Sequence, residues 1–344
     1  MRPLSEKTLN KLYAELGLPK EKTDLLHDYF LCFANLYGVI DVRDAWKVFL
    51  HYEGAGVVRK KDFVAFSGIA QREPGHPYSI LELREVYRAE TSVDPADRLI
   101  VNNRLILPGH GKYTLIYNTM EHQCGKSFYM PEEKREFLSY VEDRFFLSPE
   151  GEKMVRFLGR LKTSGKRKGF DGKVKGAILD VDGKPVAGKC LRDFVFYAYE
   201  EQFEINFARS ETTKERFRSM FRKTALDKLL DRILIELQTG GYVYNSSMLD
   251  FLDQFARLLD RDFGVSLNSA QFETFTKLFW SLNNRSHLWL NCGWQPEALF
   301  RSTGGGLPKY ISVGPNLKKE FESGAMDRDA FERQLAALGI KLLD

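Results

Sequence analysis

The segment Gly183–Cys190 is the part of the chain that comes closest to a known catalytic motif. It matches the phosphate-binding pattern Gly-x-x-x-x-Gly-Lys-Ser/Thr except at its last position, where Cys190 replaces the hydroxyl residue. The hydroxyl of that motif holds Mg²⁺, whereas a thiol offers a soft sulfur to this hard cation. We therefore expect a β-hairpin leading into a helix here, and no nucleotide-hydrolysing site.

Three residues of zinc-ligand type, His110, His122 and Cys124, lie within fifteen residues of one another. A helix over 112–124 would point His122 and Cys124 about 200° apart, and a fourth ligand is missing. No histidine occurs between His122 and His287, so the long middle of the chain lacks an imidazole base for a Ser or Cys nucleophile. We expect no metal, no cofactor and no catalytic residues, with an enzyme of unknown class as the third alternative for function.

Basic residues are concentrated between Arg160 and Lys175, where seven of them accompany a single acid, Asp171. The segment has a net charge of +6, although the whole chain has only +4. Such a cluster is typical of a phosphate-backbone contact, because each neutralised phosphate releases counterions. Its glycines favour a solvated, mobile linker, and the phosphate contact is the alternative. The candidate nucleic-acid contacts in this segment are Lys162, Lys166, Arg167, Lys168, Lys173 and Lys175.

A second basic group, Arg59, Lys60 and Lys61, lies at the start of a predicted helix near the N-terminus. It is the third of three short helices, and β-prone runs at 86–89 and 98–101 follow it. Three helices followed by a hairpin is the order of a winged helix-turn-helix, in which the third helix enters the major groove. Structural use or a protein contact is the alternative, because apolar residues leave this helix little polar surface.

From residue 131 onward the pattern is helical almost throughout, so the predicted fold class is mainly α with a minor β part (α+β). We predict a winged-helix-like N-terminal domain over 1–130, an irregular helical bundle domain over 131–300, and a tail over 301–344 with a terminal helix. The bundle domain includes a basic linker at 160–176 and a small hairpin at 177–187. The predicted bundle helices span about 189–208, 211–238, 246–262 and 268–283, and the terminal helix about 327–338.

Composition limits the setting in which the protein acts. No run approaches the roughly 18 apolar residues of a membrane helix, and the first residues are polar. The four cysteines are far apart and form no Cys-x-x-Cys pair, so we expect reduced thiols. These features predict a cytoplasmic protein with no membrane association, and they leave the oligomeric state open.

The segment 283–299 gathers one Arg, one His, one Cys and two Trp between two helical regions. Its Gly and Pro set a turn, and its two indole rings are suited to anchor a core with their N–H groups satisfied. We interpret the segment as a structural signature composed of Asn284, Arg285, Trp289, Gly293, Trp294 and Pro296.

Together with 36–40, 127–140 and 312–317, this signature resembles a group of bacterial proteins, mostly from Firmicutes, that often have a C-terminal SEC-C zinc-binding motif. That motif needs three Cys plus a further Cys or His in one cluster, and these 344 residues contain no such cluster. The resemblance implies relatives, and it implies no activity, zinc site or docking partner for this chain.

We therefore predict a non-enzymatic, nucleic-acid-associated or regulatory binding protein that uses the basic linker and the helix-turn-helix-like element. The alternative is a helical protein–protein interaction module that seats its partner on the Trp turn and on aromatic helix faces. The aromatic run from Phe194 to Phe207 is most simply core. The candidate partners are thus nucleic acid and another protein.

Overall fold

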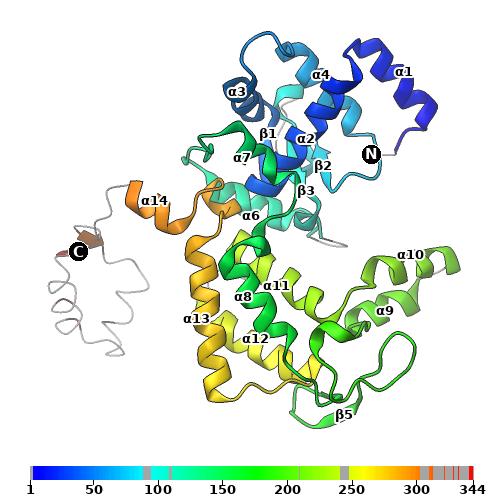
Figure 1. Cartoon of the computed structure of the whole chain (residues 1–344), viewed down its shortest axis with the longest axis vertical. Coiled ribbons are helices and arrows are strands. Elements are labelled where there is room, and N and C mark those ends of the chain that lie inside the picture. The colour runs from blue at the N-terminus through cyan, green and yellow to red at the C-terminus, as the bar shows by residue number, and fades with distance from the viewer. Residues whose placement is uncertain are drawn as a thin grey trace. The chain divides into compact units, whose positions relative to one another are not determined.

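The described part of the chain is mainly helical, as the sequence predicts, with one small antiparallel sheet and two further strand pairs (Figure 1). It forms two compact units, Met1–Gln295 and Pro296–Asp344. The structure is a computed structural model, and it describes residues 3–87, 94–107, 111–208, 210–240, 248–302, 310–312 and 341–343, together with Phe321, Arg328 and Glu332.

The first unit begins with short helices grouped around a three-stranded sheet (Figure 1). The helices are α1 (Glu6–Leu16), α2 (Lys20–Tyr37), α3 (Val42–Glu53), α4 (Lys60–Ala70), α5 (Leu83–Val86), α6 (Thr114–Gln123) and α7 (Lys134–Leu138). The strands are β1 (Val39–Asp41), β2 (Tyr78–Leu81) and β3 (Leu99–Asn102). The 3-10 turns are η1 (Pro95–Asp97), η2 (Asn103–Leu105), η3 (Ser139–Val141) and η4 (Phe145–Leu147).

Local sequence explains where these helices begin and end. Asp41 caps α3, since its carboxylate accepts the backbone N–H of Asp44 at 2.7 Å. Gly38 ends α2 with a φ of +71°, a conformation that side chains other than glycine adopt at a cost. Both positions are predictable from the sequence, and the predicted third helix from residue 60 to 69 is confirmed as α4.

The sheet has the strand order β1-β3-β2, and both pairs are antiparallel. Val101 at its centre pairs with Val39 on one side and Ser79 on the other. The strand predicted at 98–101 is therefore confirmed as β3.

The strand predicted at 86–89 is wrong, because Val86 ends helix α5 and the partner strand β2 lies earlier in the chain. Glu82 and Glu85 form a capping box that starts α5, and this local hydrogen bonding outweighs the β propensity of the valine. Residues 88 and 89 lie outside the described part.

A closely packed set of aromatic rings fills the space between α2, α3 and α4. Tyr29 and Phe30 on α2 make ring contacts with Phe49 on α3 and with Phe63 on α4. All four side chains are fully buried. This core therefore fixes the three helices against one another through large apolar surfaces.

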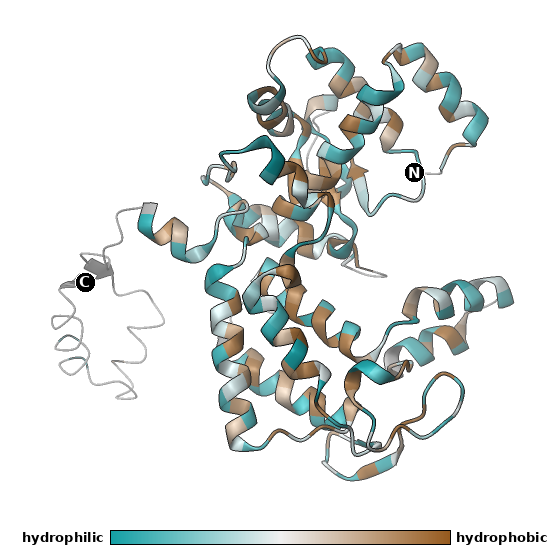
Figure 2. Ribbon diagram, in the orientation of Figure 1, coloured by the Kyte–Doolittle hydropathy of each residue, from teal (hydrophilic) through white to brown (hydrophobic). Residues whose placement is uncertain are grey.

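The rest of the first unit surrounds a second core. Leu229, Phe255, Phe275 and Phe279 are among its fully buried members. Figure 2 shows hydrophobic and hydrophilic residues alternating around the helices of this region, as amphipathic helices require. Its elements are α8 (Pro149–Gly159), β4 (Lys166–Lys168), β5 (Val174–Ala177), η5 (Leu191–Asp193), α9 (Tyr199–Phe207), α10 (Glu211–Phe221), α11 (Ala225–Thr239), α12 (Met248–Phe263), α13 (Ser269–Arg285) and η6 (Trp289–Asn291).

Two predicted bundle helices need correction. The helix at 189–208 is reduced to α9, with only a 3-10 turn at 191–193 before it. The helix at 211–238 is two helices, because Thr224 caps α11 by accepting the backbone N–H of Asp227 at 3.1 Å. The helices predicted at 246–262 and 268–283 are confirmed as α12 and α13.

The prediction of a basic linker at 160–176 needs the largest correction, because this segment contains most of the antiparallel strand pair β4–β5. The small hairpin predicted at 177–187 is confirmed. Its turn is closed by a 2.8 Å hydrogen bond from the backbone N–H of Asp180 to the carbonyl of Lys184, and Gly183 has a φ of +76°.

The second unit contains α14 (Pro296–Ser302) and two short parallel strands, β6 (Tyr310–Ser312) and β7 (Lys341–Leu343). The terminal helix predicted at about 327–338 lies largely outside the described residues. Among the helices that are described, none combines the length and the apolar character needed to cross a membrane.

Candidate nucleic-acid interface

The basic cluster of the sequence forms a two-stranded projection, here called the basic hairpin and defined as residues 164–177. Its turn is closed by hydrogen bonds from the N–H of Gly169 to the carbonyl of Lys173 at 2.8 Å, and from Gly172 to the carbonyl of Gly169 at 3.0 Å. Gly172 has a φ of +73°, which the turn requires. The glycines that favour a mobile linker in the sequence therefore form a turn between two strands.

The base of the basic hairpin is fixed to the end of α12. Thr163, which is buried, donates its hydroxyl hydrogen to the carbonyl of Phe263 at 2.6 Å. The backbone N–H of Ser164 donates to the carbonyl of Gly264 at 2.8 Å. Because these bonds join segments about a hundred residues apart in sequence, no local pattern could predict them.

An ion pair also fastens β4 to α12. The Lys168 ammonium lies 2.7 and 2.8 Å from the two carboxylate oxygens of Asp260. Burial alone would raise the pKa of Asp260, but hydrogen bonds from Lys168 and Ser266 hold that pKa below its ordinary value. Lys168 therefore has a structural partner and is less available to a ligand than its neighbours on the hairpin.

A groove of about 450 Å³ runs between the basic hairpin and α12. Four cationic side chains from three elements line it, namely Lys168 on β4, Arg232 on α11, and Arg257 and Arg261 on α12, together with the acid Asp260. Arg257 and Arg261 also pair with acids of their own helix. The arginines belong to no basic run in the sequence, and only the i,i+4 spacing of Arg257 and Arg261 signals that they share a helix face.

The remaining cations of the segment differ in exposure and in pairing. Lys175 pairs with Asp171 within the hairpin, at 3.2 Å. Arg167 is half-buried on β4. Within the described part of the chain, no ion pair involves the exposed side chains of Arg160, Lys162, Lys166 and Lys173. These four are thus the cations most available to phosphate groups.

Phe170, at the tip of the basic hairpin, is 96% exposed. The guanidinium carbon of Arg261 lies 4.5 Å from the centre of its ring, which is a cation–π distance. An aromatic ring that is open to solvent beside a groove lined with cations is the combination that proteins use to stack bases while tracking a phosphate backbone.

The other predicted basic group lies on α4, at the end of the first unit away from the basic hairpin (Figure 1). Arg59 precedes α4 and pairs with Asp62 at 2.6 Å, whereas Lys60 and Lys61 are exposed. Past Lys61, the only fully exposed position of the helix is Ala65. The helix therefore has lysines that could contact phosphates, but it lacks an exposed polar face that could read bases.

The signature segment 283–299 joins the two cores of the first unit. The indole N–H of Trp289, which is buried, donates to the carbonyl of Asn35 on α2 at 2.8 Å. Trp294 donates in the same way to the carbonyl of Ser127 at 2.9 Å. Gly293 has a φ of +81°, and a Cβ there would lie 2.9 Å from the ring of Tyr37.

The other signature residues occupy the ends of helices. Asn284 and Arg285 complete α13, and Arg285 pairs with Glu150 on α8 at 2.9 Å. Pro296 begins α14. In all of these contacts the signature residues serve packing and helix termination.

A polar cleft of about 300 Å³ beside the signature bears on the enzyme alternative, since titratable and hydroxyl side chains line it, namely Glu136, Arg144, Ser286 and His287. His287 is ill-suited to act as a base for Ser286. Its Nδ1 donates to the carbonyl of Gly293 at 2.6 Å, and its Nε2 lies 3.2 Å from the side-chain amide of Gln295. Burial lowers the pKa of His287, so the ring is neutral and both nitrogens are engaged.

The structure describes the phosphate-loop pattern of the sequence and two of the three residues of its metal pattern. Lys189 of the loop-like segment pairs with Asp180 at 3.2 Å, and a 3-10 turn follows in place of the helix that a phosphate loop needs. His122 and Cys124 are both exposed near the end of α6, and His110 lies outside the described residues.

No protein-family model, no curated protein and no solved structure matches this chain. Evidence about function therefore comes from the geometry of the basic hairpin and its groove.

Proposed function

We propose that the protein binds single-stranded nucleic acid in the groove between the basic hairpin and α12. The exposure of Phe170 beside this groove is the observation that carries the proposal. In this arrangement Lys166 and Lys173 neutralise phosphates, and the ring of Phe170 stacks on a base. Stacking and phosphate contact are both tolerant of sequence, so we expect little preference among sequences of similar flexibility.

The N-terminal helices have a supporting role in this proposal. We infer that they form a winged-helix-like module, because α2, α3 and α4 are followed by the paired strands β2 and β3. Apart from Lys60 and Lys61 at its start, α4 has no exposed polar residue, which argues against base reading in a major groove. A cytoplasmic location and kinship with the SEC-C-bearing bacterial group belong to the same proposal, the latter supported by the signature segment.

The test is a fluorescence anisotropy titration of the full chain with a labelled homopyrimidine strand and with a duplex of the same length, at several salt concentrations. The variant Lys166→Ala/Lys173→Ala removes two cations that have no ion pair in the described structure. It should reduce the slope of log K against log salt by about 1.4, because each single-strand phosphate contact contributes about 0.7. Lys168 is left in place because its loss would loosen the hairpin.

Lys60→Ala/Lys61→Ala is the matched control, with the same charge change at the distant α4. It should leave the affinity and the slope for the single strand unchanged. If this control reduces the slope and the hairpin variant does not, α4 is the contact and the proposed interface is wrong. No binding to either oligonucleotide at low salt would refute nucleic-acid binding altogether.

A second candidate function is a protein contact on α9 and α10. The prediction that the aromatic run is core holds for Phe194 and Phe196, but Phe203 is 52% and Phe207 71% exposed. Met220 on α10 is also exposed, so α9 and α10 together present several large apolar side chains to solvent, as surfaces that contact other proteins often do.

A photo-crosslinking residue placed at Phe207 tests this candidate, with one at Glu215, which is also exposed but polar, as its control. A covalent partner recovered from position 207 and absent from position 215 would support the contact. Equal recovery from both positions, or none from either, would contradict it.

A further inference from the structure

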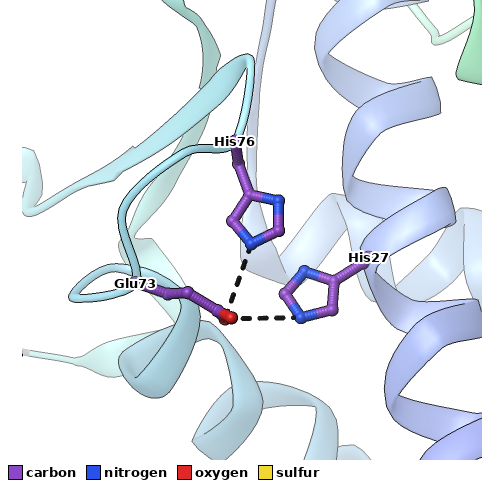
Figure 3. A group of neighbouring side chains, drawn as sticks. All are labelled: His27, Glu73 and His76. Atoms are coloured by element: carbon purple, nitrogen blue, oxygen red, sulfur yellow. Dashed lines mark ion pairs between the residues drawn. The ribbon is translucent and has the colours of Figure 1, made fainter. Parts of the chain in front are cut away.

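Three side chains with metal-binding atoms meet between α2 and the turn that follows α4. His27 is on α2, and Glu73 and His76 lie on the segment between α4 and β2 (Figure 3). The Nε2 atoms of His27 and His76 lie 3.4 and 3.5 Å from the same carboxylate oxygen of Glu73. The turn residue Gly75, with a φ of +98°, lets Glu73 and His76 face the same side.

Two of the three distances between these atoms match a tetrahedral metal site. Zinc bonds to imidazole nitrogen and carboxylate oxygen are about 2.0–2.2 Å long, which places neighbouring ligand atoms roughly 3.3–3.6 Å apart in a tetrahedron. The two nitrogen–oxygen distances, 3.4 and 3.5 Å, fall in that range. All three candidate ligand atoms lie within 4.8 Å of one another.

The second observation is the state of His76. Its Nε2 is buried, and it has no hydrogen-bond partner within the described residues. Buried polar nitrogens in proteins nearly always have a partner, and an ion is one of the partners that accounts for an exception. The ring of His76 also stacks on that of His27, with centres 4.4 Å apart, which leaves both Nε2 atoms facing Glu73 (Figure 3).

Tyrosines hold this group in place from two sides. The Nδ1 of His27 is 2.7 Å from the hydroxyl of Tyr78, which is buried, so the Nε2 of His27 is the atom left to face the cluster. Tyr13 on α1 donates a hydrogen bond to Glu73, and its hydroxyl lies 3.1 Å from the Nε2 of His27. Outer hydrogen bonds of this kind orient ligands in known metal sites.

The exposure also fits. The side chains of His27, Glu73 and His76 remain 19%, 24% and 27% exposed, so an ion can reach them from solvent. A hydrogen-bonded cluster without an ion would account for Tyr13, His27 and Glu73. The Nε2 of His76, in contrast, lies 3.5 Å from Glu73 and makes no hydrogen bond in the described structure.

We propose that His27, Glu73 and His76 bind one divalent transition-metal ion of the zinc type, with the hydroxyl of Tyr13 or a water in the fourth position. Two imidazoles and one carboxylate suit zinc, and cobalt can replace it. The ion would tie α2 to the turn after α4 and, through Tyr13, to α1. This site shares no residue with the basic hairpin, so the proposal of metal binding can be tested independently of nucleic-acid binding.

The experiment uses the full chain with its purification tag removed and its metal stripped by a chelator. Zn²⁺ is titrated calorimetrically, and Co²⁺ is titrated while its visible absorption is recorded. We expect one equivalent of each metal and the intense visible bands of tetrahedral Co²⁺. His27→Gln and His76→Gln should each weaken binding by more than about 100-fold, and Tyr78→Phe by roughly 10- to 100-fold.

His51→Gln is the matched control, because His51 is exposed on α3 and away from the cluster. It should bind Zn²⁺ as the unaltered chain does. His76→Gln also shows whether His76 is a metal ligand or only stabilises the fold. Since its Nε2 makes no hydrogen bond in the described structure, the metal-free variant should melt near the metal-free parent, and only the rise in Tm on adding Zn²⁺ should disappear. Binding that is absent, or that is equal in His76→Gln and His51→Gln, would overturn the proposal.

Discussion

Phe170→Ala separates stacking from charge at the proposed interface. The side chain is 96% exposed, and its only ring contact in the described structure is with Arg261. Loss of that cation–π contact should reduce the free energy of unfolding by about 0.5–1 kcal/mol at most. The variant should therefore fold normally.

The effect on binding should be much larger. A base stacked on an aromatic ring contributes about 1–3 kcal/mol, and about 1.4 kcal/mol corresponds to a tenfold change in Kd. Phe170→Ala should therefore raise the Kd for a single strand roughly 5- to 150-fold. Because no charge is removed, the dependence of log K on log salt should stay unchanged, in contrast to Lys166→Ala/Lys173→Ala.

The assay is the same anisotropy titration, with Val174→Ala as the matched control. Val174 is exposed on the same hairpin and apolar, but it has no π face. Its loss should change Kd by less than about twofold. Phe170→Trp should restore binding, because an indole also stacks. If Phe170→Ala and Val174→Ala weaken binding equally, the stacking argument is refuted.

Two further predictions concern stability. Gly38→Ala would place a Cβ 2.5 Å from the ring of Trp289 at a φ of +71°, and should reduce the free energy of unfolding in urea by roughly 2–5 kcal/mol. The control Gly17→Ala has a similar φ of +69° but no atom within 4 Å of its Cβ, and should reduce that free energy by only about 1–2 kcal/mol. Equal reductions in the two variants would contradict the predicted clash with Trp289. The folded-state pKa of Asp260 is lowered, so its pair with Lys168 contributes stability above the unfolded pKa of about 3.9 and loses it as pH falls through the folded value. Because both side chains are about a third exposed, we expect the pair to contribute at most about 1 kcal/mol to the free energy of unfolding. The difference in this free energy between pH 7 and pH 3 should therefore be smaller in Lys168→Ala than in the unaltered chain.

Local signals predicted many elements of this fold. Asp41 before α3, Gly183 in the turn of the hairpin at 177–187 and the apolar spacing of α12 and α13 each act through residues close in sequence, and that hairpin and these two helices lie where the sequence predicts them. The strand predicted at 86–89 failed because a capping box competes with β propensity over the same residues, and the sequence does not state which of two local preferences prevails.

The interface was only half predictable. The sequence located the cations of 160–175 but favoured a linker, because glycine-rich basic segments are flexible unless something distant holds them. Here the hydrogen bonds from Thr163 and Ser164 to the carbonyls of Phe263 and Gly264 fix the segment. The sequence does not predict the role of Phe170, because the exposure of its side chain depends on the turn between β4 and β5.

The proposed metal cluster has one signal in the sequence. Glu73 and His76 have the Glu-x-x-His spacing of known ligand pairs, but their partner His27 is on a helix far earlier in the chain. His110, His122 and Cys124 are closer together in sequence, yet His122 and Cys124 are exposed. Proximity along the chain is a weak guide to ligands, because packing brings them together.

The sequence by itself therefore determined the mainly helical character, the positions of most helices and the place where positive charge accumulates, since each of these follows from residue type and short-range spacing. Only the tertiary structure decided that the basic segment is a hairpin fixed to α12, that Phe170 is open to solvent, and that His27 meets Glu73 and His76. The physical reason is that these features depend on contacts between segments distant in the chain, which form only when the cores are packed.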